Sequence, residues 1–174
     1  FTLLAAVLLT ATTFARVGIN TTLNTLQINE GDATPANWVS LSTASLPTYT
    51  INTFYADLGG YVIEVNSDGT HGLVVAMQDQ GNSNWHEAND LLSNPDNHDT
   101  DGAKFIDWRM PTKRELKLIY EVYSNGIEVN LNDSPYWSST ENNSNVAWVL
   151  LFSNGAQVTT NKDYSYNVRA VRAF

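Results

Sequence analysis

The chain has 174 residues, of which 43% are hydrophobic and 11% aromatic, which is enough for one ordinary core but too short for two full domains. Asp and Glu total 18 against 9 Lys and Arg, so the net charge of -9 repels phosphate backbones and anionic lipid, and we expect no nucleic-acid partner. The absence of cysteine excludes disulfides, thiolate zinc sites and cysteine nucleophiles.

The first segment is an apolar run over residues 1–14 that carries no charge. Thr13 and Ala15 place small residues at the two positions that signal peptidase inspects, so we predict a signal peptide over residues 1–15. No basic residues precede the run, and we expect the signal peptide to be clipped at its start. The run is shorter than the ~20 apolar residues of a transmembrane helix, so we expect no membrane insertion of the mature chain. A buried N-terminal helix or strand and a pilin-type stem are the weaker alternatives.

Residues 16–53 are rich in Thr, Asn and Ser, and their apolar residues follow no sustained period. Pro35 and Pro47 add further breaks. We therefore predict a linker or N-terminal arm over residues 16–53, followed by one domain over residues 54–174.

The predicted domain opens with a β-hairpin and a short helix. Residues 61–65 alternate as a strand does, residues 73–77 form an apolar run typical of a buried strand, and a turn sequence joins the two. Asn84 and Glu87 have the spacing of a capping box. The apolar residues that follow lie on one face of a helix that Pro95 ends.

A second, longer helix is predicted from Thr112. Its hydroxyl and the Glu115 carboxylate have the spacing of a capping box, in which each side chain accepts a hydrogen bond from the other residue's backbone N–H. From Leu116 onward, apolar residues recur at i, i+3, i+4 and i+7. Gly126 supplies the left-handed position that commonly ends a helix.

After this helix the apolar pattern changes to the two-residue period of strands. Residues 136–140 and 147–152 are predicted strands, and Asn154 followed by Gly155 indicates a tight hairpin from which a third strand returns. The last predicted strand covers residues 167–174. Together the elements predict an α+β fold in which two helices pack on a twisted, mostly antiparallel sheet.

Short motifs follow one another through the predicted domain, at residues 59–63, 69–74, 79–80, 85–88, 107–112, 115–116, 136–141, 147–148, 154–155 and 168–172. In this order they resemble the Lcl C-terminal domain family of bacterial surface proteins and, in part, the related "major paralogous" surface domain. The resemblance implies a C-type-lectin-like fold, secretion or display on the bacterial cell surface, and adhesion or ligand binding in place of catalysis. Ala170 stands where relatives usually carry cysteine, so a disulfide of the relatives has no counterpart at this position.

Three tryptophans within these motifs could either fill the core or stack on a sugar. Large aromatic residues are highly buried on average, and we expect Trp108 and Trp137 to be core residues. For Trp148 both roles, core residue and sugar-stacking platform, are left open.

Arg109, Arg169 and Arg172 are predicted to be structural, because an arginine on each face of the last strand suits internal ion pairing better than ligand binding. We expect their guanidinium groups to make forked hydrogen bonds to internal carboxylates. The carboxylates considered for this role are Asp107, Glu115 and Glu141.

Asp96, Asp99 and Asp101 precede a glycine turn, and such oxygen-bearing residues can wrap a hard cation such as calcium. Taken as a helix-loop-helix calcium loop from Asn97, however, the segment has Trp108 at its twelfth position, where a glutamate belongs. We therefore favour a solvated acidic loop over a calcium site, leave calcium binding open, and expect no other cofactor.

No catalytic arrangement is recognisable in the sequence. His71, His86 and His98 lack the close pairing of helical zinc sites. A nucleophile elbow, a phosphate loop and paired carboxylates are also missing, and enzymes of the related formylglycine-generating fold rely on cysteine. We therefore expect that the protein is not an enzyme.

We predict a secreted, non-catalytic binding or adhesion module that recognises a glycan or a protein. Relatives that bind sulphated polysaccharides use basic surfaces, and the net charge of -9 favours a protein partner or a neutral glycan here. The candidate ligand-binding residues combine polar and aromatic contact and are Trp148, Asn142, Asn143, Asn145, Tyr164 and Tyr166. The alternative is a structural subunit or cap of an extracellular fibre or surface layer, whose N-terminal arm pairs with a neighbour's sheet edge. Formation of a homo-oligomer is left open.

Overall fold

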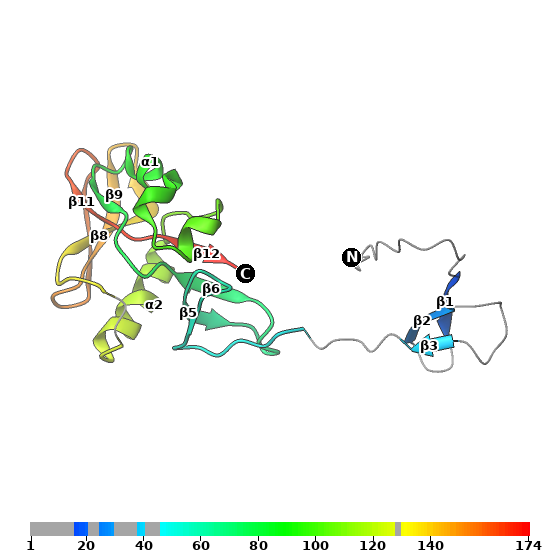
Figure 1. Ribbon diagram of the computed structural model, residues 1–174. Coiled ribbons are helices and arrows are strands. Elements are labelled where there is room, and N and C mark those ends of the chain that lie inside the picture. The colour runs from blue at the N-terminus through cyan, green and yellow to red at the C-terminus, as the bar shows by residue number, and fades with distance from the viewer. Residues whose placement is uncertain (1–15, 21–24, 30–37, 41–45, 128–129) are drawn as a thin grey trace. The chain divides into compact units, whose positions relative to one another are not determined.

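The computed structural model describes residues 16–20, 25–29, 38–40, 46–127 and 130–174 (Figure 1). The predicted signal peptide over residues 1–15 lies outside the described residues. By its contacts the chain divides into two compact units, Phe1–Leu46 and Pro47–Phe174. Each unit is described separately.

The first unit contains a small sheet of three strands, β1 (Arg16–Asn20), β2 (Thr25–Asn29) and β3 (Trp38–Ser40). The strands pair antiparallel in the order β1-β2-β3. These strands lie where the sequence predicted a linker or arm over residues 16–53. The end of that predicted segment belongs to the second unit, because the backbone N–H of Tyr49 donates to the Gly69 carbonyl at 2.7 Å and that of Asn52 donates to the Val62 carbonyl at 2.9 Å.

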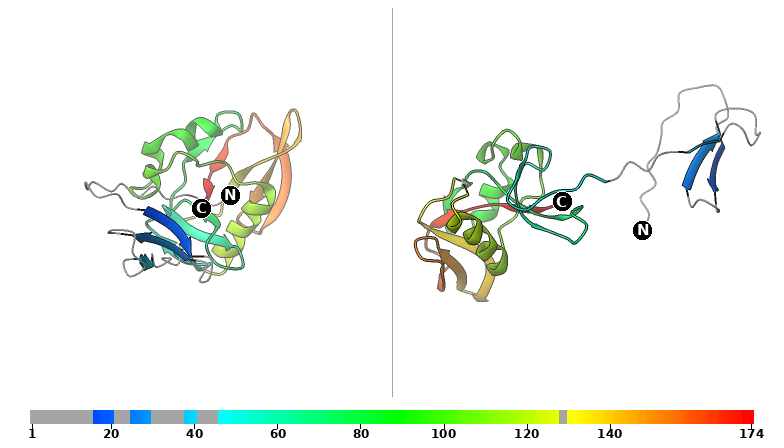
Figure 2. Two further views of the ribbon diagram at one scale, coloured as in Figure 1. Left: turned by 90° about the vertical axis from the view of Figure 1, so that its right-hand side faces the viewer. Right: turned by 90° about the horizontal axis from the view of Figure 1, so that it is seen from below.

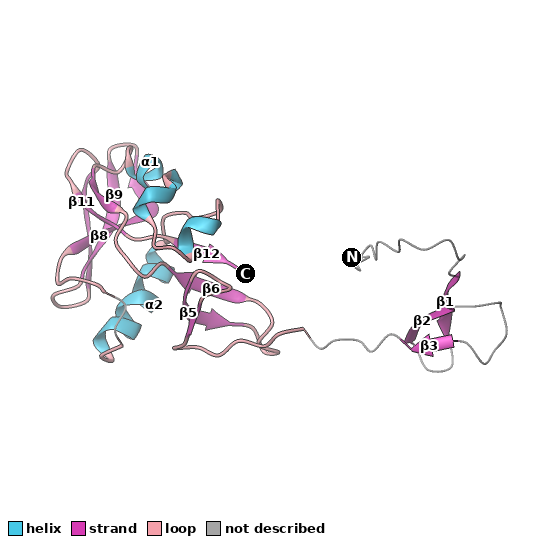
Figure 3. Ribbon diagram, in the orientation of Figure 1, coloured by secondary structure: helices cyan, strands magenta, loops and turns pink. Residues whose placement is uncertain are grey.

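The second unit is built from two sheets and two α-helices (Figure 3). The four-stranded sheet has the order β12-β6-β5-β4 and is formed by β4 (Phe54–Tyr55), β5 (Gly60–Val65), β6 (Gly72–Val75) and β12 (Val171–Ala173). The five-stranded sheet has the order β10-β9-β8-β11-β7 and is formed by β7 (Gly81–Ser83), β8 (Pro135–Asn143), β9 (Val146–Leu151), β10 (Ala156–Asn161) and β11 (Tyr166–Val168). All pairs are antiparallel except β11 with β8. The helices are α1 (Ala88–Ser93) and α2 (Lys113–Ser124), with short 3-10 helices at Pro95–Asn97 and Gly102–Lys104. The α+β prediction is confirmed, with two sheets in place of one.

Helix α2 begins and ends as its local sequence predicts. The Glu115 backbone N–H donates to the Thr112 hydroxyl at 3.3 Å, and the Thr112 backbone N–H donates to the Glu115 carboxylate at 2.8 Å, so both halves of the capping box are present. Gly126 follows the helix with a φ of 77°, in the left-handed region. The residues of α2 buried against the sheets are Leu116, Ile119 and Val122.

Helix α1 begins later than its sequence predicts, at Ala88. The Asn84 side chain does accept a hydrogen bond from the Glu87 N–H, at 3.0 Å. The Trp85 N–H, however, donates to the Lys162 carbonyl at 2.9 Å, which ties this residue to the β10–β11 loop and keeps it outside the helix. Asn84 therefore caps a turn that leads into the helix.

The two helices cover opposite faces of the five-stranded sheet. Ala88 and Leu92 of α1 share one hydrophobic cluster with Trp137 and Val149, whereas α2 shares a second cluster with Leu150. Because side chains alternate along a strand, Val149 and Leu150 of β9 point to opposite faces. Figure 3 accordingly shows α1 and α2 at opposite ends of the second unit, and Figure 2 shows α2 beside the β9–β10 hairpin.

The last predicted strand, residues 167–174, is broken in two. β11 lies inside the five-stranded sheet and β12 lies at one end of the four-stranded sheet, so the segment joins the two sheets. At the break, the Ala170 N–H donates to the Gln80 side chain at 2.6 Å, and the Ala170 carbonyl accepts from the Ala76 N–H at 3.0 Å. These hydrogen bonds replace ladder pairing at the crossing, which is why the continuous strand expected from the alternating pattern does not form.

Candidate functional site

Two of the three tryptophans considered above lie in the core. The indole N–H of Trp108 donates to the Gly102 carbonyl at 2.8 Å, and that of Trp137 donates to the Ser83 carbonyl at 3.0 Å. Both rings belong to the cluster under α1. Their polar edges are therefore satisfied inside the protein, and neither ring is available to a ligand.

The arginines pair with carboxylates, although not all with those considered. Arg109 makes a forked pair with Glu115 at 2.7 and 2.8 Å, and Arg172 donates to Asp107 at 2.8 Å. Burial alone would raise the pKa of the Glu115 carboxyl, but the hydrogen bonds from Arg109 and from the Thr112 backbone outweigh it and hold that pKa below its usual value.

Arg169 pairs with Asp79, a carboxylate that sequence reasoning did not consider. The Arg169 side chain is 0% exposed, and it also donates to the carbonyls of Ala76 at 2.7 Å and Asn130 at 2.6 Å. No local pattern links Asp79 to an arginine so distant in the sequence. The available signals were its place in the 79–80 motif and its position shortly after a buried strand, and neither indicates which residue it pairs with.

The carboxylates of the acidic loop have separate surroundings. The Asp99 side chain accepts from the Gly102 N–H at 2.7 Å, Asp101 pairs with Lys104 at 2.6 Å, and Asp96 lies exposed in the first 3-10 helix. Within the described residues, no group of three or more His, Cys, Asp or Glu side chains is arranged to hold a metal ion.

The predicted ligand-binding loops meet around one buried cation that sequence reasoning did not single out. The Lys162 side chain is 3% exposed, although it lies in the β10–β11 loop. Its ammonium group pairs with Glu141, donates to the Ser144 carbonyl at 3.0 Å and lies 4.2 Å from the centroid of the Trp85 ring. The buried Lys162 side chain therefore joins the β10–β11 loop to the β8–β9 turn and to Trp85.

The six predicted ligand-binding residues do not form one surface. Asn142, Asn143 and Asn145 are exposed at the β8–β9 turn, and Tyr164 is exposed in the neighbouring β10–β11 loop. The ring of Tyr166 packs on Trp137 at a centroid distance of 5.0 Å, in the cluster under α1. Trp148 lies on the opposite face of the sheet, which it shares with Leu150 and α2.

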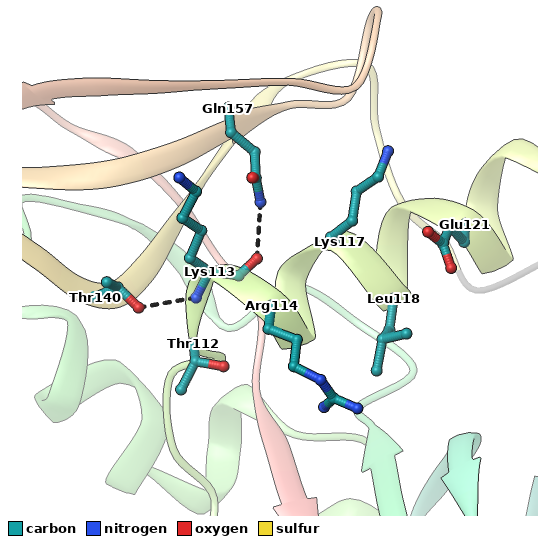
Figure 4. Close-up of a pocket in the computed structure, with 8 residues that line it drawn as sticks. All are labelled: Thr112, Lys113, Arg114, Lys117, Leu118, Glu121, Thr140 and Gln157. Atoms are coloured by element: carbon teal, nitrogen blue, oxygen red, sulfur yellow. Dashed lines mark hydrogen bonds between the residues drawn. The ribbon is translucent and has the colours of Figure 1, made fainter.

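An open groove lies beside Trp148, between the first turns of α2 and the β-strands. It encloses about 620 Å³. We call it the α2 groove, and its lining residues are Thr112, Lys113, Arg114, Lys117, Leu118, Glu121, Thr140 and Gln157 (Figure 4).

Lys113 is held in the α2 groove through both its backbone and its side chain. Its backbone N–H donates to the Thr140 hydroxyl at 2.9 Å, and its carbonyl accepts from the Gln157 side chain at 2.8 Å. Its ammonium nitrogen lies 3.1 Å from the centroid of the Trp148 ring, a cation–π contact. Because Lys113 covers this face of the ring, a sugar could stack there only by displacing the lysine.

The α2 groove differs from the rest of the second unit in its charge pairing. Within 46–127 and 130–174, six basic side chains form ion pairs within 4.0 Å, and these are Lys104, Arg109, Arg114, Lys162, Arg169 and Arg172. For Lys113 and Lys117 the same residues supply no carboxylate within that distance. The ammonium group of Lys117 lies 4.8 Å from the centroid of the Tyr120 ring. The groove can therefore offer two ammonium groups to an acidic ligand, with Glu121 at its far end.

Sequence reasoning missed this groove. Lys113 and Lys117 are four residues apart on a correctly predicted helix, which places them on one face, and this was an available signal. Gln157 comes from a hairpin far along the chain, so its place in the groove depends on the packing of α2 on the sheet. The net charge of -9 gives no indication of a local basic surface.

Comparison with known proteins supports the family resemblance. The family model described as the Lcl C-terminal domain matches residues 32–172, which include β3 and nearly all of the second unit. A comparison with curated proteins found no match. Among the described residues, no helix is both long and apolar enough to cross a membrane. Lcl C-terminal domains are not a known catalytic family. Because the match covers most of the sequence, the chain belongs to the Lcl C-terminal domain family.

Proposed function

We propose that the chain is a secreted, non-catalytic binding module of the bacterial cell exterior, and that the α2 groove holds acidic groups of its ligand. The family is one of bacterial surface, lectin-like domains, which supports a binding role. The observation that carries the choice of site is the pair Lys113 and Lys117, which face one groove without a carboxylate partner among the described residues.

The position of Lys113 disfavours a purely structural role for this residue. The N-terminal turn of a helix carries partial positive charge, and a cation placed there costs about 0.3–1 kcal/mol. Arg114, in the same turn, is compensated by its ion pair with Glu64. Among the described residues, the ammonium group of Lys113 contacts the Trp148 ring and no carboxylate, and the ring orients the ammonium group without neutralising it. A side chain that lowers the stability of its own helix in this way is expected where the side chain serves binding.

The net charge of -9 is compatible with an acidic ligand at this groove. Charges separated by more than a Debye length, about 8 Å at physiological ionic strength, are largely screened from one another. A carboxylate or sulfate in the groove would be governed by the two nearby ammonium groups more than by distant surface carboxylates. The local charge of the groove therefore supports an acidic ligand, whereas the net charge of the whole chain favoured a protein partner or a neutral glycan.

The test uses the full chain and two acidic polymers, polygalacturonate and poly-L-glutamate, whose binding is measured by biolayer interferometry. The variant K113Q/K117Q removes both charges and keeps side-chain length, and K104Q is the matched control because Lys104 lies outside the groove. We expect at least one polymer to bind, and its affinity to fall about tenfold or more in the double variant alone. Failure of both polymers to bind, or equal losses in both variants, would refute the proposed function.

A further inference from the structure

The α2 groove borders a strand with an unpaired outer edge. β10 is the end strand of the five-stranded sheet, and among the described residues no further strand pairs with it. Its sequence, AQVTTN, contains no charged residue and no proline, and Val158 is 39% exposed. Natural sheets usually protect such edges with lysine, proline or a covering loop. β10 therefore has the backbone and side-chain properties of a strand that accepts another strand.

The edge and the lysines belong to the same surface. The side chain of Gln157 extends from β10 to the carbonyl of Lys113 at 2.8 Å, so the strand lies directly against the first turn of α2. In Figure 4, the ammonium groups of Lys113 and Lys117 lie on either side of Gln157. A strand added at about 4.8 Å from β10 would place one of its faces toward this turn.

The spacing of the lysines matches that of side chains in an extended chain. Residues four apart in an α-helix are separated by about 6 Å along the axis, because each residue rises 1.5 Å. Alternate residues of a strand are about 6.6 Å apart and point to the same face. Two acidic side chains at positions i and i+2 of an added strand would therefore have the spacing of Lys113 and Lys117.

We propose that the ligand of the α2 groove is an extended, acidic segment of a partner protein, which adds to β10 as a further strand. The inference rests on the proposed function and names its ligand class. The partner's backbone pairs with β10, its alternate Asp or Glu side chains contact Lys113 and Lys117, and its other face covers Val158. The uncharged edge of β10 offers hydrogen bonds to the backbone of such a segment, and the two ammonium groups offer charge to its acidic side chains.

The probes are dye-labelled peptides that alternate Glu and Val, and binding to the full chain is followed by fluorescence polarisation. Two further peptides carry backbone N-methyl groups at either the odd or the even residues. Only one of these two sets of N–H groups can donate to β10, because successive N–H groups of a strand point to opposite edges. We expect one methylated peptide to lose about tenfold or more in affinity and the other to retain it. We also expect K113Q/K117Q to weaken the unmodified peptide, and K104Q to leave it unchanged.

Equal affinities of the two methylated peptides would overturn strand addition, because a side-chain contact alone does not distinguish their backbones. Lysine-dependent binding of polygalacturonate with no binding of the unmodified peptide would also overturn it. That second result would leave the α2 groove as a site for acidic ligands, so the failure of this inference is distinguishable from the failure of the proposed function.

Discussion

Replacing Arg169 with methionine should destabilise the second unit strongly. The change keeps an unbranched apolar side chain in a site that is 0% exposed, but it leaves the Asp79 carboxylate and the carbonyls of Ala76 and Asn130 without the donors described above. Removing one partner of a buried ion pair costs about 3–5 kcal/mol. The Asp79 side chain is 20% exposed and can regain some hydration, so we expect about 3 kcal/mol. A loss of that size is a large part of the 5–15 kcal/mol that stabilises a typical domain, and lowers Tm by roughly 10 °C.

The measurement is urea unfolding of the full chain followed by tryptophan fluorescence. R114M is the matched control, because Arg114 also forms an ion pair but its side chain is 64% exposed, and we expect its unfolding midpoint to stay close to that of the unmodified chain. R169M/D79N should recover part of the lost stability, because a neutral amide replaces a half-buried carboxylate that has lost its guanidinium partner. If R169M unfolds at the same urea concentration as R114M, the reasoning about the buried pair is wrong.

The further predictions concern the two ends of α2 and the β9–β10 turn. Because the folded-state pKa of Glu115 is depressed, the stability that its charge contributes is present above the unfolded pKa of about 4.3 and is lost as the pH falls through the folded value. Thermal melts from pH 7 to pH 3 should therefore show E115Q less stable than the unmodified chain at neutral pH, with a gap that narrows only below about pH 4.3; a gap independent of pH would contradict this. Gly155→Ala should cost about 2 kcal/mol in urea unfolding, because a Cβ there would lie 2.5 Å from the Tyr120 ring and φ is +73°. Gly126→Ala should cost about 1 kcal/mol, since φ is +77° but no described atom lies within 4 Å of the added carbon; equal costs would show that the Tyr120 contact carries no penalty.

The parts of the fold that could be predicted are those with local causes. The capping box of Thr112 and Glu115 and the left-handed Gly126 depend on residues within one helix, and all three lie as predicted. The late start of α1 could not be predicted, because the hydrogen bond that ties Trp85 to Lys162 joins segments far apart in the chain. An alternating pattern likewise could not reveal the break in the last strand, since two different sheets supply its partners.

The candidate site was predictable only in part for the same reason. The sequence places Lys113 and Lys117 on one face of a helix, but which carboxylates lie within ion-pair distance of them, and none of the described ones does, depends on tertiary packing. Loop composition favoured Tyr164 and Tyr166 equally, yet Tyr164 is exposed and Tyr166 packs against Trp137. Composition indicates which residues suit recognition, whereas tertiary packing decides which of them face solvent.

The passage of one C-terminal segment through both sheets has a consequence for how the protein is made. β11 fills an interior position between β8 and β7, and β12 pairs with β6, whose residues are synthesised much earlier. Neither sheet can be completed until these last strands have left the ribosome, so the second unit should finish folding only after its synthesis. Contacts between such distant segments also slow folding, because a long loop must close before they form. For a protein that we propose to be exported, this delay means that the second unit is still incompletely folded when its synthesis ends.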